Sequence, residues 1–130
     1  MAYVAPNNMI GEYTVNVALS GTSATSLLSN AASSGRVFKV LSIVAANVDG
    51  TNAVDCTVSV YTNGAVAQGS APSGGTAFPI ASTISVPADA SLVVSDTTTP
   101  IMLAANTSLG ATAGAGNAIT MTVTYQEYAG

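Results

Sequence analysis

The stretch AITMTVTYQEY, residues 118–128, alternates apolar and polar side chains from Ile119 to Gln126. A period of two residues, together with β-branched side chains, is typical of a β-strand that is buried on one face. Threonine at every second position fits the solvated face of a pleated strand better than it fits a helix. The stretch therefore predicts a strand whose core face carries Ile119, Met121, Val123 and Tyr125.

Other stretches repeat this alternation. Residues 13–19 (YTVNVAL) and 54–61 (VDCTVSVY) have the same period of two. Residues 36–47 (RVFKVLSIVAAN) are apolar on both faces, so we expect this strand to lie in the centre of its sheet or under a partner. Residues 24–30 (ATSLLSN) fit either a short strand or one helical turn. Shorter strands are predicted at 78–86, 91–95, 101–105 and 107–113.

About eight strands with glycine- and proline-rich turns, and no convincing helix, predict an all-β protein. We expect an antiparallel β-sandwich, either jelly-roll-like or immunoglobulin-like. The Asp-Gly pair in DGTN, residues 49–52, predicts a hairpin turn, because it readily adopts positive φ angles. Residues 1–12 are expected to form an extended N-terminal arm, because proline, asparagine and glycine interrupt any regular element there. Residues 13–130 are then a single sandwich domain, which is an ordinary size for one core.

Charged residues make up 6% of the chain, against about a quarter in a typical protein. The net charge is −4, and Arg36 and Lys39 are the only cations. We therefore expect neither nucleic acid nor an anionic membrane surface as a partner. A surface with so little charge suits a chain that is packed against neighbours, although an extracellular domain with a Ser/Thr-rich surface would share this composition.

The N-terminal residues lack the basic and apolar regions of a signal peptide, and no apolar run approaches the roughly 20 residues of a membrane helix. The single cysteine, Cys56, allows no intrachain disulfide. The lack of a signal peptide and the lack of a disulfide favour synthesis in the cytoplasm. Cys56 lies in an alternating stretch and is expected to be a small core residue.

Catalytic chemistry is not expected. The chain has no histidine, which removes the commonest general base and metal ligand. Asp49, Asn52 and Asp55 carry oxygen donors that suit calcium, but their spacing does not match the twelve-residue calcium loop, so calcium binding there stays open. We expect no enzyme, no catalytic or metal residues and no cofactor. The remaining carboxylates, at Glu12, Asp89, Asp96 and Glu127, fall at expected turns and strand ends.

Four of the five tyrosines lie near the ends of the chain. Tyr13 and Tyr125 are expected to be neighbouring core residues on the first and last strands. Aromatic side chains also anchor interfaces. We therefore take Tyr3 and Tyr128 as interface candidates. Met9 and Ile10 join them, because an arm without strand alternation cannot bury its own apolar groups.

The order of segments resembles a family. SSGRVFKVLSIVAANV is followed by CTVSVYTNG, ISVPADASLVV, TPIMLAANTSLGATA and a final AITMTVTYQEY. Over residues 13–128 this is similar to small all-β structural proteins of tailed bacteriophages, including cyanophages. The resemblance is greatest to the decoration or cement proteins on the outside of the capsid. The motifs that carry it are a VPA turn, a P-I-x-L strand and a terminal strand with YQE, none of which is a catalytic signature.

The resemblance implies a non-enzymatic virion protein that stabilises the phage head. Its partners would be the major capsid protein and copies of itself, in a homo-oligomer such as a trimer. It would be made in the host cytoplasm and would end on the capsid exterior. A phage tail or host-receptor-binding component is the first alternative. A bacterial surface or carbohydrate-binding β-sandwich module is the second.

Overall fold

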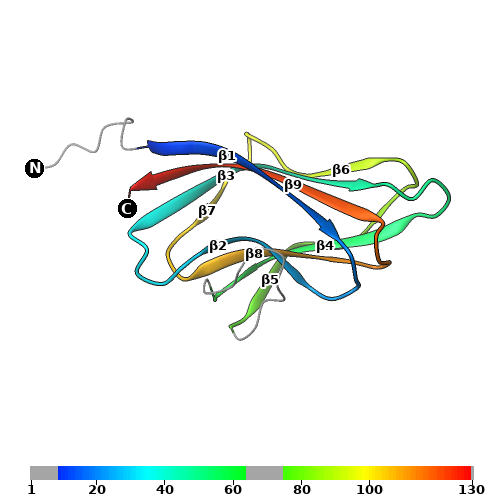
Figure 1. Cartoon of the computed structure of the whole chain (residues 1–130), viewed down its shortest axis with the longest axis horizontal. Helices are drawn as coiled ribbons and strands as arrows, with labels where there is room; N and C mark the ends of the chain where they lie inside the picture. The colour runs from blue at the N-terminus through cyan, green and yellow to red at the C-terminus, as the bar shows by residue number, and fades with distance from the viewer. Residues whose placement is uncertain (1–8, 64–74, 130) are drawn as a thin grey trace, which may run out of the picture.

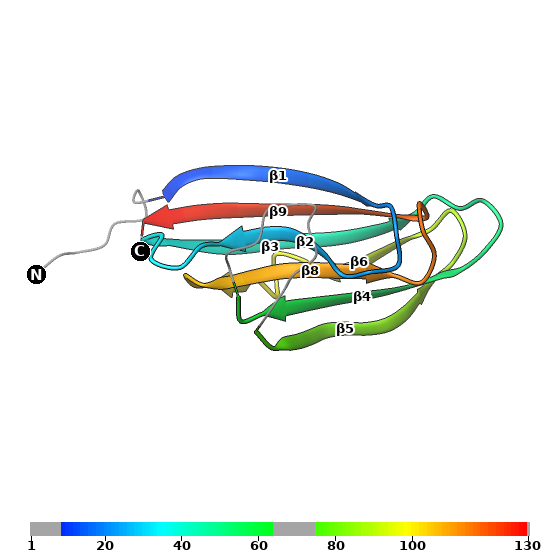
Figure 2. The same ribbon diagram turned by 60° about the horizontal axis from the view of Figure 1, so that its bottom comes forward.

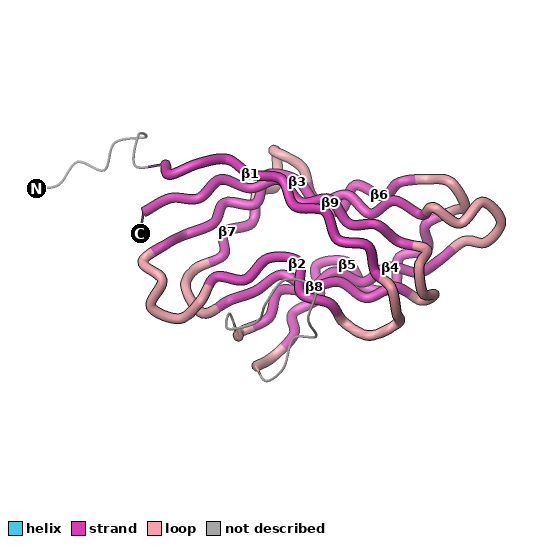
Figure 3. Tube along the Cα trace, in the orientation of Figure 1, coloured by secondary structure: helices cyan, strands magenta, loops and turns pink. Residues whose placement is uncertain are grey.

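The computed structural model describes residues 9–63 and 75–129, and these residues form nine β-strands and no helix (Figure 3). Five strands form one sheet, here called sheet A, and four form a second, sheet B. Sheet A contains β1 (Met9–Leu19), β3 (Arg36–Asn47), β6 (Ser91–Ser95), β7 (Ile101–Leu103) and β9 (Ile119–Ala129). Sheet B contains β2 (Thr25–Asn30), β4 (Val54–Tyr61), β5 (Ala77–Val86) and β8 (Thr107–Ala113).

The two sheets face each other as the layers of a sandwich (Figure 1). The strand order is β1-β9-β3-β6 in sheet A and β2-β8-β4-β5 in sheet B, and every pairing is antiparallel. β6 and β7 pair with successive parts of β3, so they fill one position of sheet A as an interrupted strand. With these two strands counted as one, eight positions are arranged as in a jelly roll rather than an immunoglobulin domain.

The core lies between the sheets and confirms most of the expected core-facing positions. Ile119, Met121 and Val123 of β9 are fully buried, because β9 lies inside sheet A between β1 and β3. β3 is central, as expected, with β9 on one side and β6 and β7 on the other. The buried apolar residues are Leu19, Leu27, Leu28, Val40, Ile43, Ala45, Val54, Cys56, Val58, Val86, Leu103, Leu109, Ala111, Ala113, Ala118, Ile119, Met121 and Val123.

The first strand differs from expectation at two places. β1 begins at Met9, so residues 9–12 of the expected arm pair with β9 and belong to sheet A, whereas residues 1–8 lie outside the described residues. Tyr13 does face the core side and lies opposite Tyr125, but its side chain is 43% exposed. The reason is that β1 is the edge strand of sheet A, so its core-facing side chains are covered from one side only.

The predicted hairpin at residues 49–52 is wrong. This segment connects β3 in sheet A to β4 in sheet B, so it crosses between the layers. Gly50 does not have a positive φ angle. The turn is instead held by the Asp49 carboxylate, whose Oδ1 accepts hydrogen bonds from the backbone N–H groups of Thr51 (2.8 Å) and Asn52 (3.1 Å). Aspartate stabilises such a turn by mimicking a backbone carbonyl.

Glycine is required where the loop before β9 passes the loop after β1. A Cβ atom at Gly116 would lie 2.7 Å from the carbonyl oxygen of Ser20, which is closer than such atoms approach. The neighbouring Asn117 has a φ angle of 59° and donates its N–H to the Leu19 carbonyl (3.0 Å). Close backbone contact thus closes the end of the sandwich where β1 ends and β9 begins.

Candidate functional site

The described residues contain no pocket and no group of three or more acidic, cysteine or histidine side chains that could hold a metal ion. Within the same residues, no helix could span a membrane. Asp49 uses its carboxylate oxygens within its own turn, whereas Asp55 lies exposed on β4. The search for a functional site therefore turns to the surfaces.

The structure brings together three of the four predicted interface residues. Met9 and Tyr128 are directly paired at one end of sheet A, and Ile10 lies at the register shift beside them. The Met9 and Ile10 side chains are 40% and 46% exposed. Tyr128 is half-buried, and its hydroxyl donates a hydrogen bond to Gln126 Oε1 (2.7 Å). Tyr3 lies outside the described residues.

The outer face of β1 and β9 is mostly polar, whereas Val93 and Met102 are exposed on the outer face of β6 and β7. Thr14 Oγ1 and Thr124 Oγ1 share a hydrogen bond (3.0 Å), and Thr122 Oγ1 donates to Asn16 Oδ1 (2.9 Å). These cross-strand pairs tie β1 to β9 along most of their length. At the end of sheet A where β1 begins and β9 ends, here called its terminal end, Gln126 Nε2 donates to Glu12 Oε1 (2.9 Å). These polar side chains therefore form hydrogen bonds with one another and do not gather into a binding site.

An aromatic cluster lies on the opposite, core-facing side of the same end. The ring centroids of Tyr13 and Tyr125 are 5.5 Å apart, and those of Phe38 and Tyr125 are 5.2 Å apart. Tyr13 covers Gly11, where an added Cβ would lie 2.5 Å from the tyrosine oxygen. An aromatic ring over an edge glycine protects the exposed backbone of that strand. Burial raises the pKa of Tyr125, and the Glu127 carboxylate and Tyr13 add to this shift, so its phenol is neutral at physiological pH.

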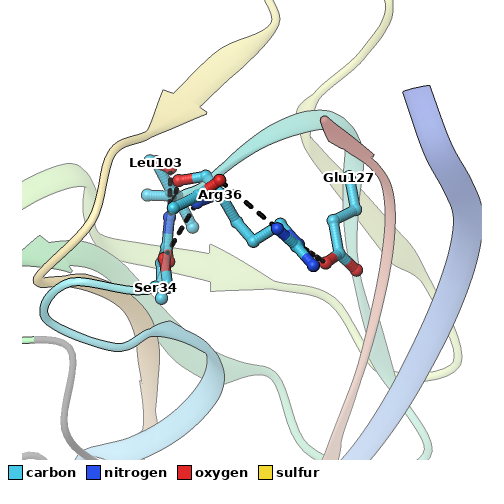
Figure 4. Close-up of polar contacts among 6 residues, drawn as sticks. Ser34, Arg36, Leu103 and Glu127 are labelled. Atoms are coloured by element: carbon cyan, nitrogen blue, oxygen red, sulfur yellow. Dashed lines mark hydrogen bonds and ion pairs between the residues drawn. The ribbon is translucent and has the colours of Figure 1, made fainter. Parts of the chain in front are cut away.

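One ion pair joins β3 to β9 beside this cluster. Arg36 Nε donates to Glu127 Oε2 at 3.0 Å, as the close-up shows (Figure 4). The Arg36 side chain is 43% exposed, so the pair contributes little to stability. The backbone around it is held more firmly. Asn30, which is fully buried, donates from Nδ2 to the carbonyl oxygens of Arg36 and Leu103, both at 2.9 Å, and accepts a hydrogen bond from Ser34 Oγ.

The sequence did not predict the exposed apolar side chains along β5. Phe78 is 57% exposed, Ile80 43% and Ile84 40%. The sequence predicted a strand over residues 78–86 but assigned no face to these side chains. Phe78 and Ile84 pair with Val60 and Cys56 of β4, so they lie on the core-facing side of sheet B. They are exposed because β5 is the edge strand of this sheet, with no further strand beside it. On sheet A, Val93 (59%) and Met102 (57%) are also exposed.

Asp96 stabilises a turn in the same manner as Asp49. Its Oδ1 accepts hydrogen bonds from the hydroxyl and the backbone N–H of Thr98 (2.9 Å for the latter) within the loop that connects β6 to β7. These bonds lower the pKa of Asp96, and the bonds from Thr51 and Asn52 lower that of Asp49. Both carboxylates are therefore used as caps of turns.

No protein-family model matches the sequence, and a comparison with curated proteins found no match. A comparison with solved structures found the crystal structure of a pentameric capsid protein isolated from metagenomic phage sequences. The two chains are 15% identical with a TM-score of 0.38, over 92% of this chain and 63% of that one. The chain thus spans less than two thirds of that protein's length. Sequence identity and a TM-score this low show neither a shared family nor a shared function.

Proposed function

We propose that the chain is a non-enzymatic structural protein of a tailed-phage virion that decorates the outside of the capsid. It binds the major capsid protein and copies of itself, and it stabilises the head shell through these contacts. The resemblance of residues 13–128 to phage decoration proteins supports this proposal. The jelly roll supports it as a fold-level analogy, because viral capsid domains and lectins both use this architecture.

The observation that carries the proposal is the character of the surface. Nine large apolar side chains are exposed on the described residues, in a chain with only two cations. Scattered exposed apolar residues are normal, but several of these follow the edge strands β1, β5 and β6. Permanent interfaces are more apolar than transient ones, so such a surface suits a chain that stays bound.

The terminal end of sheet A is the proposed contact with the shell. Met9 and Ile10 are exposed there beside Tyr128, and the chain continues from Met9 into residues 1–8 with the further apolar side chains Tyr3 and Val4. Aromatic and long apolar side chains supply most of the binding energy in protein interfaces. Deleting residues 2–8 should therefore weaken shell binding without unfolding the sandwich.

Co-sedimentation with phage heads that lack this protein tests the proposal. The wild-type chain should bind these heads saturably. Ile10→Asp should reduce the affinity at least about tenfold, because a carboxylate is costly to bury in an interface. The matched control is Val48→Asp, since Val48 is 59% exposed at the opposite end of sheet A. Equal binding by the two variants would place the contact elsewhere, and no binding by the wild type would contradict a decoration role.

A carbohydrate-binding module is the second candidate. The exposed ring of Tyr13 lies on the same face of sheet A as the Arg36–Glu127 ion pair, because Gly11 and Tyr13 pair with Glu127 and Tyr125. An aromatic ring beside charged hydrogen-bonding groups suits a sugar ring, and lectins also use jelly rolls. Binding to a glycan array that is lost in Tyr13→Ala, with no binding to heads, would favour this candidate or a receptor-binding tail component.

A further inference from the structure

β1 is a free edge strand of sheet A (Figure 2). One side of β1 pairs with β9, and none of the described strands pairs with its other side. An edge strand presents a row of unpaired N–H and C=O groups that another strand can complete. Proteins that remain monomeric usually interrupt or charge such an edge.

The other edges of the sandwich are interrupted. β5 contains Pro79, which lacks an N–H group, and Thr83, which has a φ angle of 52°, and its register with β4 shifts twice. β2 has only six residues and a register shift. β6 and β7 have five and three residues. Prolines, bulges and short strands all make an edge a poor partner for a further strand.

β1 has none of these interruptions over most of its length. It has eleven residues, and its pairing with β9 is regular from Gly11 to Leu19, with the only register shift at its start. The strand contains no proline and a single charge, Glu12. It is therefore the one long and regular free edge among the described strands.

We propose that β1 pairs antiparallel with β1 of a second copy of this chain, about a two-fold axis at Val15. The two A sheets would then form one continuous sheet across the dimer. This inference rests on the self-association in the proposed function and names the surface that performs it. A two-fold contact makes dimers, so a trimer would need another contact.

The axis at Val15 matches apolar side chains with apolar side chains. In this register Val15 lies opposite its own copy, and Tyr13 lies opposite Val17. All three point to the core side of sheet A, since they pair with Tyr125, Val123 and Met121 of β9. Tyr13 is 43% exposed, and Val15 and Val17 are half-buried, so each has apolar surface left to cover. Cross-strand pairs of aromatic and β-branched side chains stabilise a sheet.

The same register separates the charges. Each copy carries a net charge of −4, so association must avoid placing carboxylates together. Glu12 would lie opposite Ala18, and the two Glu12 residues would be six positions apart, or about 20 Å. That separation exceeds the Debye length of about 8 Å at physiological ionic strength. Their repulsion is therefore largely screened.

Crosslinking through one introduced cysteine, in solution and without phage particles, tests the register. Val15→Cys should form a disulfide-linked dimer under mild oxidation, because directly opposed Cβ atoms approach to about 4.5 Å, which is the upper end of the separation that a disulfide spans. Tyr13→Cys should not, since its copy would be about 13 Å away along the strand. The wild-type chain is the baseline, because Cys56 is buried. Phe78→Cys on the edge of sheet B is the matched control, because Phe78 is 57% exposed and pairs with Val60 rather than with Cys56. Crosslinking of Phe78→Cys at or above the level of Val15→Cys would overturn the proposal.

Sedimentation equilibrium gives an independent measure. Val15→Lys places two ammonium groups together at the axis and should weaken dimerisation about a hundredfold or more. Ile84→Lys should leave it unchanged. Thermal melting shows whether each variant is folded, and Thr14→Lys on the outer face replaces Val15→Lys if the latter is not. A folded β1 variant that dimerises like the wild type would overturn the inference, as would a monomeric wild type at high micromolar concentration. Failure to bind phage heads would count only against the proposed function.

Discussion

Asn30→Asp is expected to destabilise the sandwich strongly, although it replaces one nitrogen by one oxygen. Asn30 is fully buried where the turn after β2 meets β3 and β7. Its Nδ2 group is the donor to two backbone carbonyl oxygens, those of Arg36 and Leu103, each at 2.9 Å. A carboxylate at this position has no donor, and it would face both oxygens as a buried charge.

The magnitude follows from the two carbonyl groups that lose their partner. A buried polar group left without a hydrogen bond costs about 1–3 kcal/mol, so the two together cost about 2–6 kcal/mol. The hydrogen bond from Ser34 Oγ can persist, because a carboxylate oxygen also accepts. Because domains of this kind are stable by about 5–15 kcal/mol, the substitution removes a large share of the free energy of unfolding.

The pH dependence has a definite sign. Burial raises the pKa of a carboxyl group, so the folded variant would bind a proton more tightly than the unfolded chain. The protonated acid can donate one of the two lost hydrogen bonds. The destabilisation is therefore least below about pH 4, near the ordinary carboxyl pKa, and it grows as the pH rises through the raised folded-state pKa.

Urea unfolding followed by circular dichroism measures the effect, with Asn16→Asp as the matched control. Asn16 is exposed and only accepts a hydrogen bond, from Thr122 Oγ1, which aspartate also accepts. The control should change the free energy of unfolding by less than about 0.5 kcal/mol. If Asn30→Asp lowers the free energy of unfolding no more than Asn16→Asp does, the two hydrogen bonds from Asn30 do not stabilise the fold as argued.

Three further predictions concern the core and the turns. Val58→Asp buries an unpaired charge and should cost several kcal/mol or prevent folding, whereas Thr57→Asp on the outer face should cost much less; equal losses in thermal melts would mean that the register of β4 is wrong by one residue. Hydrogen bonds lower the pKa of Asp49, so its contribution to stability is present above about pH 4 and lost as the pH falls through the folded-state pKa. Asp49→Ala should remove that part of the acid dependence of the melting temperature, while a difference from wild type that is constant from pH 2 to 7 would contradict this reasoning. Burial raises the pKa of the Cys56 thiol, so it should react with a thiol reagent only as fast as the sandwich opens, and rapid labelling of the native protein would contradict its core position.

Most of the fold could be predicted from side-chain alternation. The core faces of β4 and β9 were predicted at Val58, Met121 and their neighbours because each of these strands has a strand on both sides. The pairing of Tyr13 with Tyr125 was also predicted and is confirmed. Alternation reports which side chains share a face, and in an inner strand one shared face is enough to ensure burial.

Edge strands and connections could not be predicted in the same way. Phe78 and Tyr13 share a face with core residues, yet both are exposed because each of their strands has a neighbour on one side only. The segment at Asp49 looks like a hairpin because turn chemistry is local, and it does not reveal whether the next strand joins the same sheet. Strand order depends on contacts between residues far apart in the chain, for which a single sequence carries no local signal.

The candidate site was predicted in part. Met9, Ile10 and Tyr128 were named from the composition of the chain ends, and the structure places them side by side. The reason is geometric, since an antiparallel pairing of the first and last strands brings both ends of the chain together. The regular free edge of β1 was not predicted, because a free edge is defined by the strands that are absent from its side.

Electron cryo-microscopy of the virions that contain this chain tests the central claim most directly. The account predicts density for the nine-strand sandwich at symmetry-related positions on the outer surface of the head, with the end of sheet A that carries Met9, Ile10 and Tyr128 against the shell. Density for the sandwich only at the tail or its fibres would contradict a role as a capsid decoration protein.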